Sequence, residues 1–89
     1  MAINAHRPDP WAHFYLGLAY RKKNRVDGAI AEYNKALAIN PSLAEVHNNL
    51  ASAYYYRGNY KLAIIHCDKA VALRGRVEPK LLELLSPYR

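Results

Sequence analysis

The chain has 89 residues, 52% of them hydrophobic, and its 13 Lys and Arg against 7 Asp and Glu give a formal charge of +6 at pH 7. This length allows one small domain and excludes a catalytic cleft between two lobes, while the positive charge favours acidic partners. The single cysteine excludes an internal disulfide, and the lack of a long apolar run excludes a membrane-spanning helix. Because a free thiol is typical of a reducing compartment, we expect a cytoplasmic protein.

Two helices are expected in the first half of the chain, over residues 10–23 and 26–39. The Asp-Pro pair at 9–10 is typical of an N-cap followed by proline at the first helical position. Within both ranges apolar residues recur at intervals of three and four, which is the spacing of one helix face. The Asn-Pro pair at 40–41 cannot continue a helix and is expected to end the second one.

Three further helices are expected over residues 43–57, 60–73 and 78–85. The segment Ser-Leu-Ala-Glu at 42–45 has the spacing of a capping box. The Gly-Asn pair at 58–59 predicts a left-handed helix end followed by a new N-cap. Since every connection is short, sequential helices are expected to lie antiparallel.

The sequence matches itself at an offset of 34 residues, without a gap. Among the identical pairs are His13 and His47, Leu16 and Leu50, Ala19 and Ala53, Tyr20 and Tyr54, Ala29 and Ala63, Ile30 and Ile64, Lys35 and Lys69, Ala36 and Ala70, and Ala38 and Ala72. A fixed period of this length indicates a repeat architecture in which each helix pair buries an apolar face on the next. We expect one repeat at about 10–41, a second at about 44–75, and a capping helix at about 78–85.

These positions resemble the tetratricopeptide repeat, a helix–turn–helix unit of the same length. The first repeat carries Leu16, Gly17, Tyr20, Ala29, Tyr33, Ala36 and Pro41 at the family's spacing, and the second carries Leu50, Tyr54, Gly58, Ala63 and Ala70. The resemblance covers about residues 9–75. It implies an all-α fold of antiparallel helix–turn–helix repeats, stacked as a short right-handed α-solenoid of about five helices. We therefore expect a flexible tail at 1–8 and a single domain at 9–89.

Several residues depart from the family pattern. Cys67 stands where the first repeat has Tyr33, and we expect it to be a small buried hydrophobe and not a reactive thiol. Gly75 replaces the closing proline and is expected to end the fourth helix. His13 and His47 occupy the usual tryptophan position, and we expect them to pack in the core, because two histidines alone make a poor metal site.

The last helix is expected to close the array. Its leucines would cover the last hairpin and its charged residues would face water; these are Leu81, Leu84 and Leu85, and Glu78, Lys80 and Glu83. Two repeats and a cap make a short array, since about three repeats are normally needed for stability. Either the cap completes the core, or the chain self-associates, or it is a fragment of a longer superhelix.

In this family the first helix of each hairpin lines a concave groove that receives peptides. The positions that the resemblance assigns to this groove are Trp11, Phe14, Tyr15, Leu18 and Lys22 in the first repeat, and Glu45, Asn48, Asn49, Ser52, Tyr55 and Tyr56 in the second. The apolar members from the first repeat predict a hydrophobic wall for a peptide. The alternative is that Trp11 and Phe14 pack on the N-terminal tail or on a neighbouring copy.

The two asparagines carry the more specific prediction. A carboxamide both donates and accepts hydrogen bonds, so Asn48 and Asn49 can hold the backbone of a peptide of any sequence. Asn49 resembles the groove asparagine of sugar-transferase and chaperone-binding members of the family. A clamp for a C-terminal carboxylate also needs Lys and Asn where Phe14 and Leu18 stand, so a chaperone tail is not the expected ligand. The alternative is a solvated surface pair.

The leading prediction is a protein-interaction module that binds a peptide segment of a protein partner. The alternative is a structural element that self-associates or belongs to a longer superhelix. The basic cluster formed by Arg21, Lys22, Lys23 and Arg25 is explained by the helix dipole, and a nucleic-acid partner is not expected. Neither catalysis nor a cofactor or metal is expected, because no catalytic constellation or phosphate-binding glycine loop can be identified.

Overall fold

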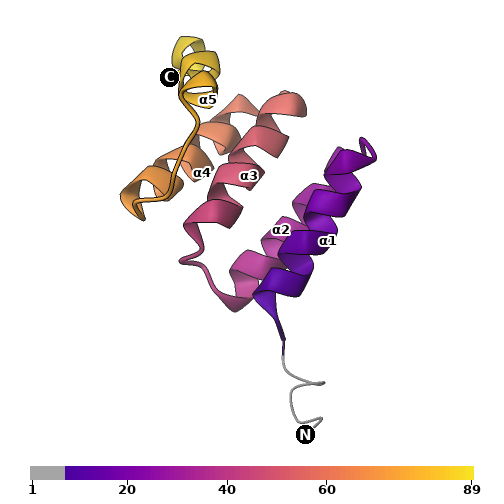
Figure 1. Cartoon of the computed structure of the whole chain (residues 1–89). Coiled ribbons are helices and arrows are strands. Elements are labelled where there is room, and N and C mark those ends of the chain that lie inside the picture. Colours follow the sequence, from indigo (N-terminus) through magenta and orange to yellow (C-terminus); the bar gives the residue numbers. More distant parts are fainter. Residues whose placement is uncertain (1–7) are drawn as a thin grey trace, which may run out of the picture.

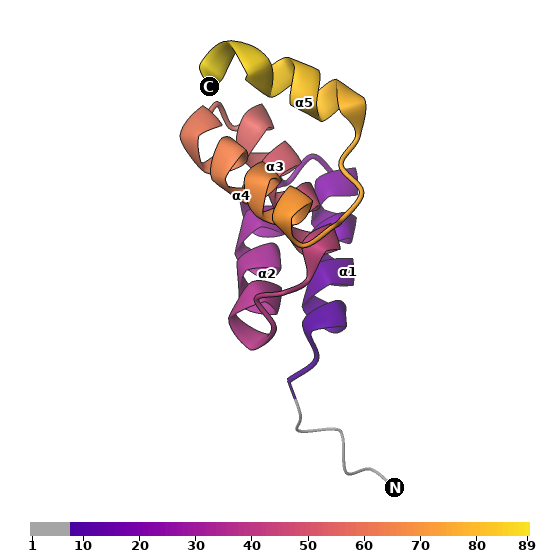
Figure 2. The ribbon, with the colours of Figure 1, turned by 90° about the vertical axis from the view of Figure 1, so that its left-hand side faces the viewer.

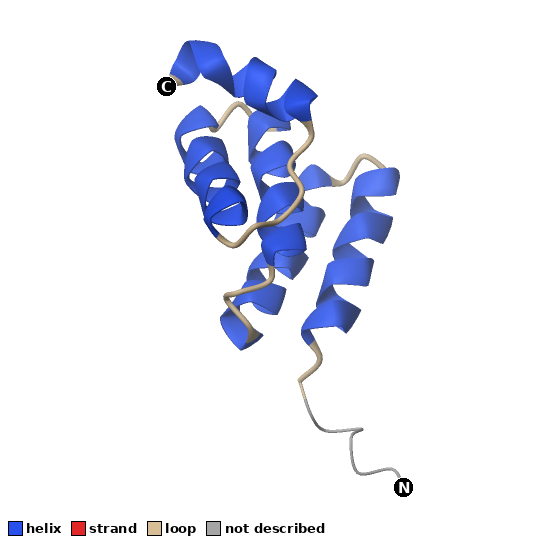
Figure 3. Cartoon of the chain, turned by 60° about the vertical axis from the view of Figure 1, so that its left-hand side comes forward, coloured by secondary structure: helices blue, strands red, loops and turns tan. Residues whose placement is uncertain are grey.

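The computed structural model describes residues 8–89, which form two antiparallel helical hairpins and a last helix (Figure 1). The helices are α1 (Pro10–Lys22), α2 (Val26–Ile39), α3 (Ala44–Tyr56), α4 (Tyr60–Ala72) and α5 (Pro79–Leu85), and a 3₁₀ turn at Ser86–Tyr88 follows. Short loops join the first four helices, and a longer segment leads from α4 to α5 (Figure 3). Helix α1 packs on α2 and α3 on α4, while the contact of α2 with α3 joins the hairpins. The all-α repeat fold is thus confirmed, and the expected tail at 1–8 lies, except for its last residue, outside the described residues.

Two helix starts and one helix end follow directly from the local sequence. The Asp9 carboxylate accepts a hydrogen bond from the Trp11 amide at 2.9 Å and caps α1. The Asn59 side chain accepts from the Leu62 amide at 3.3 Å and caps α4. Gly58, which precedes this cap, has a φ of 81°. The predictions at these positions are confirmed.

The predicted capping box before α3 is wrong. The N-cap is Leu43, and no side chain caps the helix. Instead, the Asn40 side chain accepts a hydrogen bond from the Ser42 amide at 3.1 Å. This local turn uses Asn40 to lead the chain into α3, so Ser42 is not placed to cap it.

Gly75 does not supply the left-handed end of α4, because Arg74 has that conformation, with a φ of 62°. Gly75 is needed for a close approach between segments. A Cβ atom at this position would lie 2.5 Å from the Cβ of Ala44, at the start of α3. The glycine therefore lets the chain pass the first turn of α3 on its way to α5.

The larger core cluster joins the two hairpins around the ring of Tyr33. Its fully or almost fully buried members are Phe14, Ala29, Tyr33, Ala36, Val46, Leu50 and Ala53. Gly17 makes room for the ring, because a Cβ atom there would lie 2.5 Å from Tyr33 Cε1. Small residues thus stand where the helices approach closely.

The smaller core cluster lies under α5, which crosses the ends of α3 and α4 (Figure 2). Leu81 and Leu85 of α5 pack there against Ala51, Ala63 and Cys67. Cys67 is fully buried, and burial raises the pKa of its thiol, so the prediction of a small buried hydrophobe is confirmed. Within the described residues, α5 thereby closes the C-terminal side of the array.

Equivalent positions of the two hairpins differ in burial. Leu50 is fully buried and Leu16 is 45% exposed, although both stand at the same place in the repeat. Ala53 is likewise fully buried, whereas Ala19 is exposed. Hairpin α1–α2 covers this face of α3, and within residues 8–89 nothing covers the matching face of α1. The apolar stripe of α1 that carries Leu16 and Ala19 is therefore an exposed surface.

Candidate functional site

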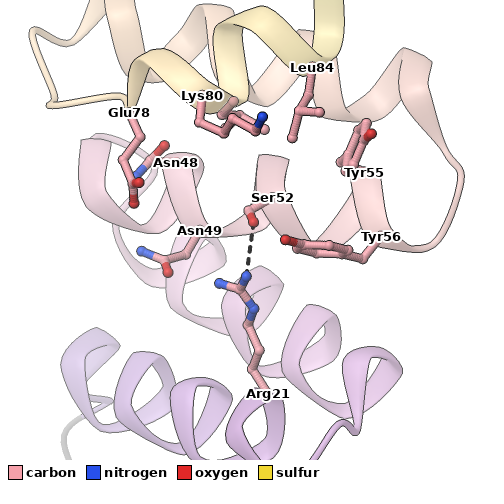
Figure 4. A pocket seen from close by; sticks show the side chains of 10 residues that line it. Arg21, Asn48, Asn49, Ser52, Tyr55, Tyr56, Glu78, Lys80 and Leu84 are labelled. Carbon is pink, nitrogen blue, oxygen red and sulfur yellow. Dashed lines mark hydrogen bonds between the residues drawn. The ribbon is translucent and has the colours of Figure 1, made fainter.

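A pocket of about 150 Å³ lies between α3, α5 and the C-terminal end of α1 (Figure 4). It is lined by Arg21, Asn48, Asn49, Ser52, Tyr55, Tyr56, Glu78, Lys80, Leu81 and Leu84. The members from α3 recur at helical spacing, which places them on one face of that helix. All the groove residues predicted on α3, except Glu45, are brought together here.

Arg21 is the only contribution of α1 to the lining, and two contacts hold it in place. Its Nη2 donates a hydrogen bond to Ser52 Oγ at 3.1 Å, and its guanidinium carbon lies 5.4 Å from the centre of the Tyr56 ring. Sequence reasoning missed this residue because the helix dipole already explained the basic cluster. Lys22, which was predicted instead, is exposed and lies outside the lining.

Phe14 does not face the groove. It is 1% exposed, and its ring centre lies 5.8 Å from that of Tyr33 in the core. The ring fills the space between the hairpins and is not available to a partner. Leu18 is half-buried and packs against the same core. These two expectations are corrected.

Trp11 and Tyr15 form an aromatic surface on α1, separate from the pocket. The Trp11 ring meets Phe14 edge-on, with centres 5.5 Å apart, and the Tyr15 ring lies 5.5 Å from Phe14. Trp11 is 38% and Tyr15 63% exposed. The predicted groove residues that stay accessible therefore include a group on α3 that lines the pocket and the separate aromatic surface on α1.

Helix α5 supplies the opposite wall of the pocket. Glu78 and Lys80 were expected only to face water; both are exposed, but they also line the pocket because α5 crosses the end of α3. In Figure 4, Lys80 and Arg21 lie on opposite sides of Ser52, and Glu78 lies beside Asn48. The repeat period contained a signal for these residues, since α5 occupies the place of a third first helix.

The two asparagines differ in the hydrogen bonds that they can still make. Asn49 Nδ2 donates to the backbone oxygen of Glu45 at 2.9 Å, which leaves its Oδ1 as an acceptor. Asn48 makes no side-chain hydrogen bond within residues 8–89, so its amide and carbonyl both remain available. The arrangement can therefore hold one or two peptide groups.

A second polar feature recurs in both hairpins at the same offset. His13 Nδ1 lies 2.7 Å from Glu32 Oε1, and one repeat later His47 Nδ1 lies 2.9 Å from His66 Nδ1. Both pairs link the two helices of a hairpin. No group of three or more potential metal-ligating side chains occurs among the described residues. Each histidine pair connects the two helices of its hairpin by a hydrogen bond.

The proton positions of the second pair follow from its neighbours. His47 Nε2 lies 2.8 Å from the Pro41 carbonyl oxygen, which can only accept, so this nitrogen carries a hydrogen. In the neutral ring His47 Nδ1 is then an acceptor, and His66 Nδ1 donates to it. Burial is the main cause that lowers the pKa of His66 to about 4, and the neighbouring His47 and Lys69 lower it further.

The first pair behaves differently. The hydrogen bond from His13 lowers the pKa of Glu32, and Lys35 adds to the effect although burial opposes it. Lys35 Nζ lies 3.1 Å from Glu32 Oε2. The carboxylate therefore stays charged beside His13, whereas His66 stays neutral beside His47.

Two models of one repeat family match the chain. The model described as TPR repeat matches residues 17–58, and the model described as Tetratricopeptide repeat matches residues 44–75. No helix within residues 8–89 is long and apolar enough to cross a membrane.

Two known proteins are similar to most of the chain. The anaphase-promoting complex subunit cut9 of Schizosaccharomyces pombe is 36% identical over 66 residues, which are 72% of this chain and 10% of that protein. The Hsp70-Hsp90 organising protein of Plasmodium falciparum is 28% identical over 76 residues, which are 85% of this chain and 14% of that protein. The chain thus spans about one tenth to one seventh of the length of these relatives.

Proposed function

The chain belongs to the tetratricopeptide repeat family, and from this premise we propose that it is a non-catalytic module that binds a peptide segment of a partner protein in the pocket between α3 and α5. The convergence of one face of α3, Arg21 and the polar residues of α5 on a single pocket carries the proposal. The names of the relatives, a subunit of a complex and an organising protein, support a role in protein assemblies.

The pocket chemistry suits an extended peptide with an acidic residue. Asn48 and the free oxygen of Asn49 would bind peptide groups. Arg21 and Lys80 flank Ser52 and would attract a carboxylate between them. The net charge of +6 also favours binding of an acidic partner.

Substitution of Asn49 or Tyr56 by alanine is expected to weaken peptide binding by about tenfold each, because both side chains line the pocket. Short synthetic peptides that carry Asp or Glu beside apolar residues would be screened on an array. The tightest binder would then be titrated by calorimetry against each variant.

Tyr15→Ala is the matched control, since Tyr15 is 63% and Tyr56 64% exposed, and only Tyr56 lines the pocket. The control is expected to bind the peptide as the unmodified protein does. If the Tyr56 and Asn49 variants bind the peptide as tightly as the unmodified protein does, and circular dichroism shows that they are folded, the proposal is contradicted. A loss caused by Tyr15→Ala alone would move the binding site to the aromatic surface of α1.

A second candidate function is structural assembly through α1. The observation in its favour is the exposed stripe of Leu16 and Ala19, whose counterparts Leu50 and Ala53 are fully buried by a neighbouring hairpin. Sedimentation velocity over a concentration series tests self-association. If the protein sediments as a monomer at every concentration, and Leu16→Asp does not change its sedimentation, self-association is excluded.

A further inference from the structure

The residues that follow α5 are tied to α4 outside the pocket. The ring of Tyr88 stacks on that of Tyr60, with centres 3.7 Å apart and 9° between the planes. Arg89 donates two hydrogen bonds to the Asp68 carboxylate, at 2.8 Å and 3.3 Å. Because Tyr60 and Asp68 belong to α4, both contacts fasten the end of α5 to the second hairpin.

Helix α5 depends on such contacts for its position. It has seven residues, of which Leu81 and Leu85 are buried. A helix of this length is not stable by itself in water, so tertiary contacts must hold it. The other pocket residues on this side are the N-cap Glu78, Lys80 and Leu84, and none of them is buried.

A series of neighbouring aromatic rings also connects Tyr88 with the pocket. Tyr60 lies 5.5 Å from Tyr55, and Tyr55 lies 5.6 Å from Tyr56, measured between ring centres. Tyr55 and Tyr56 both line the pocket. A row of aromatic rings therefore joins the segment after α5 to the wall formed by α3.

We propose that Tyr88 and Arg89 are positioning residues for the pocket, which hold α5 on α4 so that Glu78, Lys80 and Leu84 form its second wall. Release of these two side chains frees α5 to open away from α3 while the two hairpins stay folded. The effect on peptide affinity rests on the proposed function, whereas the effect on the position of α5 does not.

The test is the double variant Tyr88→Ala with Arg89→Ala, studied by hydrogen exchange and by NMR. An exposed ion pair and one aromatic stack are individually weak, so their joint loss is expected to speed exchange of the α5 amides by about tenfold. Exchange in α2 is expected to stay unchanged. The side-chain amide resonances of Asn48 and Asn49 are expected to shift as the opposite wall leaves, and affinity for the array-selected peptide to fall several-fold.

Two further variants control the experiment. Arg76→Ala removes an exposed arginine that forms no ion pair within residues 8–89, and it is expected to change none of the readouts. The charge reversal Asp68→Arg with Arg89→Asp rebuilds the ion pair and is expected to restore slow exchange in α5, which neither single reversal does.

Unchanged exchange in α5 of the double variant would overturn the proposal, as would unchanged asparagine resonances. Faster exchange with shifted resonances, in a protein that binds none of the peptides, would support the positioning role and reject the proposed function. Faster exchange with unchanged peptide affinity would show that α5 is not a wall of the binding site and would overturn the link to the pocket.

Discussion

Leu50→Ala is expected to lower the free energy of unfolding by about 3 kcal/mol, whereas Leu16→Ala is expected to cost less than about 0.5 kcal/mol. Leu50 is fully buried in the core cluster that joins the hairpins, so its truncation leaves a cavity there. Leu16 is 45% exposed and loses few contacts. Urea denaturation, followed by circular dichroism at low protein concentration, measures both values.

The comparison is informative because the two leucines stand at the same position of the repeat, one period of 34 residues apart. A cost at Leu16 that approaches the cost at Leu50 would mean that the exposed face of α1 is covered in solution. If that cost grows with protein concentration, a second copy covers it. The same pair of variants therefore also tests the assembly function.

Acidification from about pH 7 to about pH 4.5 is expected to reduce the free energy of unfolding by about 2 kcal/mol through His66. In the folded protein the pKa of this ring is lowered from 6.5 to about 4, chiefly by burial. Below pH 6.5 the unfolded chain binds the proton first, so the unfolded state is stabilised as the pH falls. Above that pH both states are neutral and the effect vanishes. Because the ring is only half-buried, we expect less than the full linkage energy.

Two substitutions separate His66 from the other titrating groups. His66→Gln keeps a neutral donor toward His47 and is expected to remove this part of the pH dependence. His66→Glu would place a carboxylate beside His47, as Glu32 lies beside His13 in the first hairpin, and is expected to move the loss of stability to a lower pH, because a carboxylate with a lowered pKa costs stability only when it becomes protonated. Chemical denaturation of the three proteins across this pH range measures the slopes. Parallel slopes would contradict the assignment to His66.

The repeat period and the local signals allowed most of the fold to be predicted from the sequence. An offset that aligns identical residues over two helices leaves few other arrangements. The prediction of a capping box was wrong because the Asn40 side chain accepts the hydrogen bond of the Ser42 amide in the turn before α3. The spacing of residues 42–45 alone does not reveal this competing turn. The role of Gly75 at the end of α4 was predicted wrongly, because Arg74 takes the left-handed conformation and Gly75 instead allows a close approach to Ala44, which only the packed structure reveals.

The candidate site was predictable on α3 and only partly on α1. Helix α3 has one polar face, so the spacing of Asn48, Ser52 and Tyr55 is enough to group them. Helix α1 carries two adjacent apolar stripes, and periodicity alone cannot decide that Phe14 turns into the core while Tyr15 stays exposed. The repeat period indicated the share of α5, because α5 stands where a third repeat would place its first helix, but the period does not specify how this short helix crosses α3 and α4.

The two ends of the helical array differ in how far their repeat surfaces are covered, and this determines at which end further repeats can be added. On the side of α5 the core is sealed, since Leu81 and Leu85 occupy the surface that another hairpin would need. On the side of α1 the repeat surface around Leu16 is open. Among the described residues, an engineered third repeat can therefore be inserted before α1 with its register preserved, whereas extension past α4 first requires the removal of α5. For protein engineering, the described module can therefore be extended at its α1 side and is closed by α5 at the other.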